Sequence, residues 1–252
     1  MRLFLFDSMF SFRFYRFVPF ALLLAIFQLM VASVMAQAPA ASAAPPSIRL
    51  RLLAFQPSHA MENVYVHDPL AAADAEGQKL PMRTYLNHES TTILLRSRRL
   101  ILTTSADSSS KKEQRLAEME LPEKTASAVL IALPMPEGSV RPYRLLAVPD
   151  SIQAFPAGSF HVINLSRSTV RIELEKKPWI IEPARTMQIK DPPVRHGNQS
   201  GMKAFVKEQE NWRRVASGLW PHPGRERVIQ LVYENPASHQ VQIIAFDDVV
   251  PR

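Results

Sequence analysis

Cysteine is absent from this 252-residue sequence, so neither a disulfide nor a thiolate-bound metal can stabilise the fold. Glycine is scarce, with seven residues against 21 prolines, and no glycine-rich phosphate-binding loop is present. Because proline cannot donate a hydrogen bond to a β-ladder, we expect the prolines at strand ends, sheet edges and loops. The fold must therefore be held by its apolar core, with stiff loops around it.

A concentrated run of one charge is missing as well. The chain has 30 basic and 23 acidic residues, a net charge of +7, and the two signs are mixed along its length. Proteins that bind nucleic acid usually carry a basic stripe on one element or face. We therefore predict no nucleic-acid partner.

Catalytic and metal-binding spacings are also lacking. None of the seven histidines forms an HxH or HExxH pair. His59, His67 and Asp68 could meet across a loop, but chance placement explains their spacing better. Ser159 and His161 lie outside any G-x-S-x-G context, which a hydrolase nucleophile would need. We therefore predict that the protein is not an enzyme and has no metal site and no cofactor.

Residues 1–36 have the pattern of a secretory signal. Arg2, Arg13 and Arg16 lead into a largely apolar run, and Val-Met-Ala at 34–36 fits the small-x-small pattern before a cleavage site. An uncleaved anchor helix is the alternative, although an apolar run of roughly 16–18 residues is short for a bilayer span. Cleavage after residue 36 predicts a periplasmic or secreted protein, which keeps 27 basic and 22 acidic residues.

The clearest structural signal is the stretch 155–174 (FPAGSFHVINLSRSTVRIEL). Its residues alternate between two strand faces before and after the polar break 166–168, most strictly where Val170, Ile172 and Leu174 alternate with charged residues. Period-two alternation around such a break predicts a β-hairpin with one buried face. A second hairpin is predicted from the runs 227–233 and 241–246, across a turn at 235–238.

Other segments follow the same pattern. The segment 47–55 alternates apolar residues with Arg49 and Arg51 and ends in Leu-Ala-Phe, which indicates burial on both faces there. The run 126–133 is apolar and is followed by prolines, as in a central strand. Roughly a dozen such short strands and no long amphipathic helix predict an all-β, antiparallel β-sandwich.

The predicted domain organisation follows from composition. An Ala/Pro-rich tether at 37–46 precedes a β-sandwich domain at 47–190, and the Pro- and Gly-containing segment 191–201 reads as a linker. The remaining residues, 202–252, form a C-terminal β-meander whose core would be marginal on its own. We therefore expect this meander to dock on the sandwich or to complete it.

One binding surface is predicted near the C-terminus. Tryptophans in a β-sandwich usually belong to the core, but Trp212 and Trp220 lie close in sequence to Arg225 and Arg227. We predict that at least one of the two tryptophans is exposed beside these arginines and contributes to binding.

Several pieces of sequence stand in a fixed order along residues 48–248, namely IRLRLLAF, VYVHDP, ALPMP, YRLLAVPD, FPAGSFHVINLS, NWRRVASGLW and RVIQLVYEN. This order resembles a group of uncharacterised secreted bacterial β-sandwich proteins. More distantly, the first strands and the aG-x-F/Y-x-V pattern are similar to modules of the periplasmic alginate-acetylation accessory family. Neither resemblance implies an activity or carries over catalytic residues, and both imply an exported all-β protein.

These observations predict an exported, non-enzymatic β-sandwich protein that binds or scaffolds another component of the cell envelope. The partner is expected to be a protein or a polysaccharide, and the membrane is contacted only through an uncleaved signal, if at all. The alternative is an accessory enzyme acting on envelope polysaccharide, with acids such as Asp150, Glu173 or Asp247 in a cleft. Such an enzyme needs two facing carboxylates roughly 5–9.5 Å apart.

Overall fold

Strands make up nearly all the regular structure in the computed structural model, which describes residues 46–250 except 73, 108–111 and 196. The predicted signal at 1–36 and most of the predicted tether lie outside the described residues. In the described part of the chain the helical elements are two 3-10 turns, η1 (Pro57–His59) and η2 (Lys112–Gln114), and no helix there could cross a membrane. The prediction of an all-β fold is confirmed.

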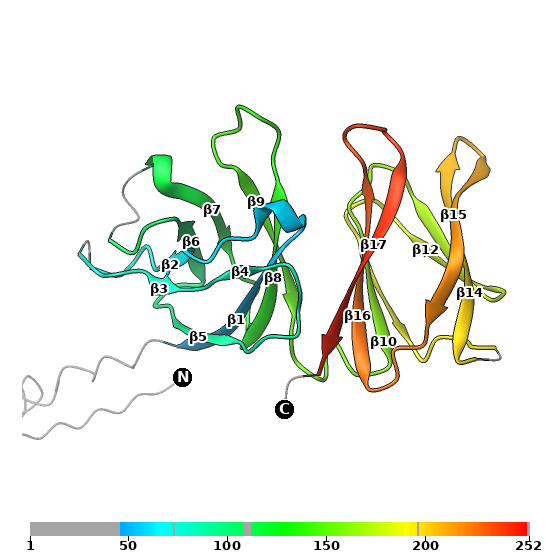
Figure 1. The fold of residues 1–252 in the computed structure, drawn as a ribbon, viewed down its shortest axis with the longest axis horizontal. Helices are drawn as coiled ribbons and strands as arrows, with labels where there is room; N and C mark the ends of the chain where they lie inside the picture. The colour runs from blue at the N-terminus through cyan, green and yellow to red at the C-terminus, as the bar shows by residue number, and fades with distance from the viewer. Residues whose placement is uncertain (1–45, 73, 108–111, 196, 251–252) are drawn as a thin grey trace, which may run out of the picture. The chain divides into compact units, whose positions relative to one another are not determined.

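Residues 46–150, here called the N-terminal half, form two sheets (Figure 1). The first has the order β4-β1-β8-β9, with β5 beside the first residues of β1 and β4 beside its last residues. The second has the order β3-β2-β6-β7. The strands are β1 (Ser47–Ala54), β2 (Tyr65–His67), β3 (Gln78–Lys79), β4 (Met82–Arg83), β5 (Thr91–Leu94), β6 (Arg99–Thr103), β7 (Arg115–Glu120), β8 (Ser127–Pro134) and β9 (Tyr143–Pro149).

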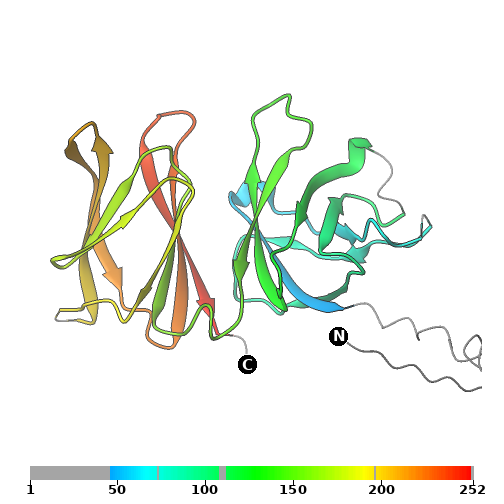
Figure 2. The ribbon, with the colours of Figure 1, turned by 180° about the vertical axis from the view of Figure 1, so that it is seen from behind.

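Residues 151–250, the C-terminal half, also form two sheets, which Figures 1 and 2 show from opposite sides. Their orders are β13-β10-β16-β17 and β12-β11-β14-β15. The strands are β10 (Ser159–Asn164), β11 (Val170–Leu174), β12 (Lys177–Ile181), β13 (Thr186–Lys190), β14 (Gln199–Glu208), β15 (Asn211–Pro221), β16 (Glu226–Glu234) and β17 (Val241–Val249).

The two halves share one strand order. In the N-terminal half β1 runs parallel to β8, and β8 forms a hairpin with β9. In the C-terminal half β10 runs parallel to β16, and β16 forms a hairpin with β17. The other two sheets also correspond strand by strand. The fold is therefore a sandwich arrangement used twice, although the sequence shows no fixed-period repeat.

Each half has a core between its own two sheets, and a third apolar cluster joins the halves. The first two cores are lined by inward residues such as Leu50 and Leu102 in one half and Val162 and Val206 in the other. The third cluster contains Leu53, Phe55, Val129, Ile131, Val148, Phe155, Ile163, Ile229, Leu231 and Phe246. The strands β1, β8, β10 and β16 are consequently covered on both faces, as the apolar end of segment 47–55 predicts.

The predicted hairpin over 155–174 is wrong. β10 pairs with β13 and β16, whereas β11 pairs with β12 and β14, so the two strands belong to different sheets. All six residues of β10 are buried, because β10 is a central strand with an apolar cluster on each face. The polar break carries the chain from one sheet to the other, and the Asn164 side chain donates to the carbonyls of Ser168 (2.8 Å) and Ile181 (2.9 Å) across that crossing.

The C-terminal segment supplies half of the second sandwich. β14 pairs with β11, and β16 pairs with β10; both partners precede the predicted linker at 191–201. The last three residues of that linker lie in β14. The predicted second hairpin, β16 with β17, is confirmed. Every strand pairing among the described residues joins two strands of the same half.

Candidate functional site

Four charged side chains are buried together where the two halves meet. Arg51 comes from the middle of β1, Asp150 follows β9, Arg227 lies near the start of β16, and Asp248 lies near the end of β17. None of the four side chains is more than 3% exposed. We call this group the Arg–Asp cluster.

Arg51 holds both carboxylates of the cluster. Its Nη1 and Nη2 donate to the two oxygens of Asp248 at 2.6 and 2.8 Å, and its Nη2 also donates to Asp150 at 2.7 Å. Its Nε donates to the second oxygen of Asp150 at 3.2 Å, and Nη1 also donates to the Leu86 carbonyl. All five N–H donors of this guanidinium are thereby used.

Arg227 completes the cluster from the C-terminal half. Its Nε donates to Asp248 at 2.8 Å, its Nη2 forms an ion pair with Asp150, and its Nη1 donates to the Phe155 carbonyl at 2.9 Å. The guanidinium carbon also lies 4.6 Å from the centroid of the Phe155 ring. The positive charges of the two arginines are thus balanced by the negative charges of the two aspartates within one buried site.

The electrostatics of the cluster favour permanent ionisation of Arg51. Burial lowers the pKa of this guanidinium, but the hydrogen bonds and charges of Asp248 and Asp150 outweigh burial and raise the pKa. A charged pair in a dry site is tolerated only when its hydrogen bonds are satisfied. The cluster meets this condition, so it can fasten the two halves but has no free carboxylate for acid–base chemistry.

The two aspartates occupy equivalent places in the repeated sandwich. Asp248 of β17 lies opposite Arg227 of β16. Asp150, just after β9, donates its backbone N–H to the carbonyl of Ser127 of β8 at 3.1 Å. The position of Arg227 in the second half is therefore that of Ser127 in the first.

His161 is the counterpart of Arg51. Arg51 lies beside Val129 of β8, and His161 lies beside Ile229 of β16. Burial, and secondly the charge of Arg227, lowers the pKa of His161 to about 4. Its Nδ1 is buried without a hydrogen-bond partner among the described residues. The neutral imidazole thus borders the charged cluster and does not join it.

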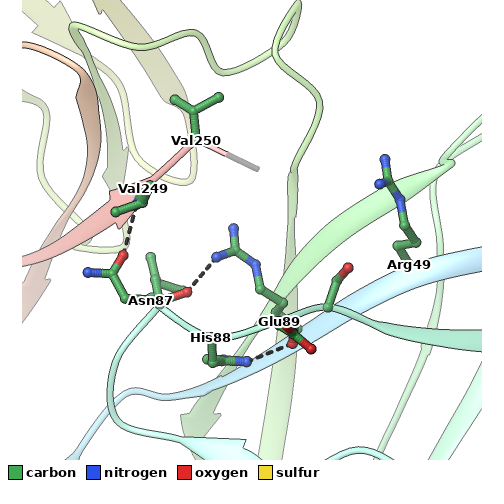
Figure 3. Close-up of a pocket in the computed structure, with 9 residues that line it drawn as sticks. Arg49, Asn87, His88, Glu89, Val249 and Val250 are labelled. Carbon is green, nitrogen blue, oxygen red and sulfur yellow. Dashed lines mark hydrogen bonds between the residues drawn. The ribbon is translucent and has the colours of Figure 1, made fainter. Parts of the chain in front are cut away.

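A pocket of about 640 Å³ opens beside the cluster and is lined by Arg49, Arg51, the segment 86–90 and the end of β17 (Figure 3). Figure 3 shows Asn87 below Val249, whose backbone N–H donates to the Asn87 side chain at 2.9 Å. His88 also lines the pocket, and burial is the main cause of its lowered pKa. Glu89 is the one acid among the lining residues, so the pocket lacks a facing carboxylate pair.

The predicted binding residues near the C-terminus are placed differently from one another. Trp220 is 7% exposed and packs on Phe160 with ring centroids 4.9 Å apart, and Arg227 belongs to the buried cluster. Trp212 is half-buried and Arg225 is exposed. The two tryptophans lie on opposite sides of a bulge in β15, which turns them to different faces of the sheet.

The acids considered for an accessory enzyme are not brought together. Asp150 is bound by two arginines, Glu173 lies 3.9 Å from Lys203 on a sheet face, and Asp247 is exposed. No group of three His, Cys, Asp or Glu side chains that could hold a metal occurs among the residues that the structure describes.

Sequence reasoning missed Arg51 and Asp248 as members of a site. Arg51 sits on the polar side of an alternating strand, and Asp248 is one of two adjacent aspartates near the C-terminus. The available signal was the equivalence of the two hairpin ends, AVPD and AFDD, each of which finishes with the aspartate of the cluster.

No protein-family model matches the chain, and no curated protein matches it.

Proposed function

We propose that this protein is an exported, non-enzymatic β-sandwich protein that binds or scaffolds another component of the cell envelope, in the periplasm or outside the cell. The partner is a protein or a polysaccharide. The expected signal at 1–36 and the resemblance to secreted bacterial β-sandwich proteins support this proposal.

One observation supports a binding role over the enzymatic alternative. Asp150, which is bound to the pocket-lining Arg51, shares two guanidinium groups with Asp248 in a buried, charge-neutral cluster. A general acid or a nucleophile must reach substrate and change its protonation or bonding state. A carboxylate that is 2% exposed and holds two halves of a protein together is suited to neither task.

The test is capture from envelope extract with residues 37–252 as bait, followed by separate digestion of the captured material with protease and with polysaccharide-degrading enzymes. A binding protein retains a protein or a polysaccharide whose covalent structure is unchanged. Recovery of shortened or chemically modified polysaccharide, lost in Asp150→Asn but kept in Asp247→Asn, would establish the enzymatic alternative instead.

A further inference from the structure

Arg171 of β11 is held between two aromatic rings and has no ion-pair partner among the described residues. Its guanidinium carbon lies 4.2 Å from the ring centroid of Phe205 and 4.8 Å from that of Trp212. Its Nε is buried and has no hydrogen-bond partner among the described residues. The two rings fix the plane of the guanidinium, which is the geometry used to bind phosphate or carboxylate.

The sheet β12-β11-β14-β15 is the outer sheet of the C-terminal half (Figures 1 and 2). Arg171 is opposite Phe205 of β14, which is opposite Arg214 of β15. The alternate residues Ile172 and Val206 point into the core. Since side chains alternate across a strand, Arg171, Phe205 and Arg214 must point outward.

The outer face carries an excess of positive charge. Lys203 and Lys207 share this face with Arg171 and Arg214. Three acids also lie there: Glu173 is 3.9 Å from Lys203, Glu175 pairs with Arg195 beside Gly201, and Glu182 accepts a hydrogen bond from the Thr169 hydroxyl at 2.6 Å. Arg171, Lys207 and Arg214 form no ion pair with any residue that the structure describes. Three cations on neighbouring strands are therefore available to an anionic partner.

The corresponding sheet of the N-terminal half is different. There Arg98, just before β6, pairs with Glu120, and Arg99 of β6 pairs with Glu118, while Lys79 of β3 forms no ion pair with any described residue. The shared strand order alone consequently does not produce an unpaired basic face. The excess is specific to the second half.

Aliphatic side chains stand beside these cations. Ile180 of β12, opposite Arg171, is 53% exposed, and Leu219 of β15, opposite Gly201, is 65% exposed. Aliphatic groups offer no stacking surface or hydrogen bond to a sugar ring. Exposed aliphatics, a half-buried Trp and unpaired Lys and Arg are together typical of surfaces that lie on a lipid bilayer.

The shape of this face also favours a broad partner. Neither the pocket beside Arg51 nor a smaller pocket beside Tyr143 is lined by its residues. The cations are spread over three strands, which matches a two-dimensional charged surface better than a small ligand. We propose that this outer face, here called the basic face, binds the surface of a membrane containing anionic phospholipids; the proposal rests on the proposed export of the chain.

The test is co-sedimentation of residues 37–252 with vesicles of phosphatidylglycerol and phosphatidylethanolamine (3:7), compared with vesicles of phosphatidylcholine alone. Each cation near an anionic membrane contributes about fivefold in binding. The triple variant Arg171→Gln/Lys207→Gln/Arg214→Gln should therefore bind about 100-fold more weakly. Binding should also fall as salt is raised from about 0.05 to about 0.5 M, because the Debye length shortens and the surface charge is screened.

The matched control is Lys79→Gln/Arg96→Gln/Arg144→Gln, which removes three exposed cations from the N-terminal half and gives the same net charge. It should bind nearly as the unchanged chain does. An equal loss in both triple variants would overturn the proposal in favour of unspecific adsorption. Thermal melts of both variants should match that of the unchanged chain, so that a loss of binding is not a loss of folding.

Trp212 gives a second readout. Its fluorescence should shift to shorter wavelength with the anionic vesicles, and Trp212→Phe should abolish that shift. Absence of vesicle binding overturns this inference but leaves the proposed function standing if envelope extract still yields a partner. Capture of an acidic protein or polysaccharide that is lost in the Arg171 triple variant, without vesicle binding, assigns the basic face to that partner instead.

Discussion

Arg51 and Asp248 lie 197 positions apart in the sequence and are joined by two parallel hydrogen bonds of 2.6 and 2.8 Å. The bond pair links β1 of the N-terminal half to β17 of the C-terminal half. Bidentate contacts of this kind fix both distance and orientation. The first and last strands of the described chain thus set how the two halves are fastened.

Asp248→Ala should destabilise the protein strongly. It leaves two buried guanidinium groups with a single carboxylate, and removing one partner from a buried ion pair typically costs about 3–5 kcal/mol. The free energy of unfolding from urea titration measures the loss. The matched control is Asp247→Ala, an exposed neighbour, which should change stability by less than about 0.5 kcal/mol. Equal, small effects of both substitutions would contradict a structural role for the cluster.

His161 should make the protein less stable in mild acid. Its pKa is about 4 in the folded chain, lowered first by burial and then by Arg227, against an ordinary value of 6.5. Above pH 7 the imidazole is neutral in both states and has no effect. As pH falls through 6.5 the unfolded chain takes up the proton first, so this group lowers the free energy of unfolding by roughly 3 kcal/mol by pH 4.

The experiment compares His161→Leu with the unchanged chain in urea titrations at pH 7.5 and pH 4.5. The variant should lose less stability on acidification, because its site no longer titrates. His239→Leu serves as the control, since it also removes one histidine but from an exposed position outside the core. Parallel pH profiles for all three proteins would argue against the buried neutral imidazole.

Local patterns in the sequence predict burial well and strand partners poorly. The apolar end of segment 47–55 correctly indicates two covered faces, because alternation reports the environment of each side chain. The three-residue polar break after β10 equally suits a hairpin turn or a crossing between sheets. Only the long-range pairing of β10 with β16, which starts over 60 residues later, decides between them.

The Arg–Asp cluster could not be predicted for the same reason. Arg49 and Arg51 occupy equivalent positions in an alternating strand, yet Arg49 is exposed and Arg51 is buried. What distinguishes them is the presence of carboxylates 99 and 197 positions away. Period-two alternation gives no information on partners at that separation.

Gly77→Ala should destabilise the N-terminal half. A Cβ at this position would lie 2.6 Å from His67 Nε2 and 2.9 Å from the Tyr65 Cβ. The His67 ring cannot easily move, because its Nε2 is 2.9 Å from the Thr103 hydroxyl and 3.0 Å from the Ser105 carbonyl. Forcing an extra methyl into such a packed site typically costs about 1–3 kcal/mol.

The matched control for this prediction is Gly218→Ala in β15. A Cβ there meets nothing within 4 Å, and the residue does not have the left-handed backbone that favours glycine. Thermal unfolding should show a lower melting temperature for Gly77→Ala and little change, or a small rise, for Gly218→Ala. A similar melting temperature for both variants would mean that the His67 ring moves aside without cost.

Splitting the chain between residues 150 and 151 should give two fragments that associate. No strand pairing among the described residues crosses this point, and the third apolar cluster supplies a matching surface on each fragment. Either fragment alone exposes that surface together with one arginine–aspartate pair of the Arg–Asp cluster, which has lost its bonds to the other pair. Each should therefore be poorly soluble when expressed alone, and the co-expressed pair should purify as a 1:1 complex.

Splitting at the predicted linker provides the contrast. Fragments 46–190 and 202–250 would separate β10 from β16 and β11 from β14, so each fragment loses strand partners within a sheet. This pair should not assemble, because hydrogen-bonded strands must be inserted into the centre of a sheet rather than joined face to face. The opposite result, in which the fragments split at the linker assemble and those split at 150/151 do not, would place the domain boundary at 191–201, as composition suggests. It would also show that the apolar interface matters more for assembly than intact strand pairing does.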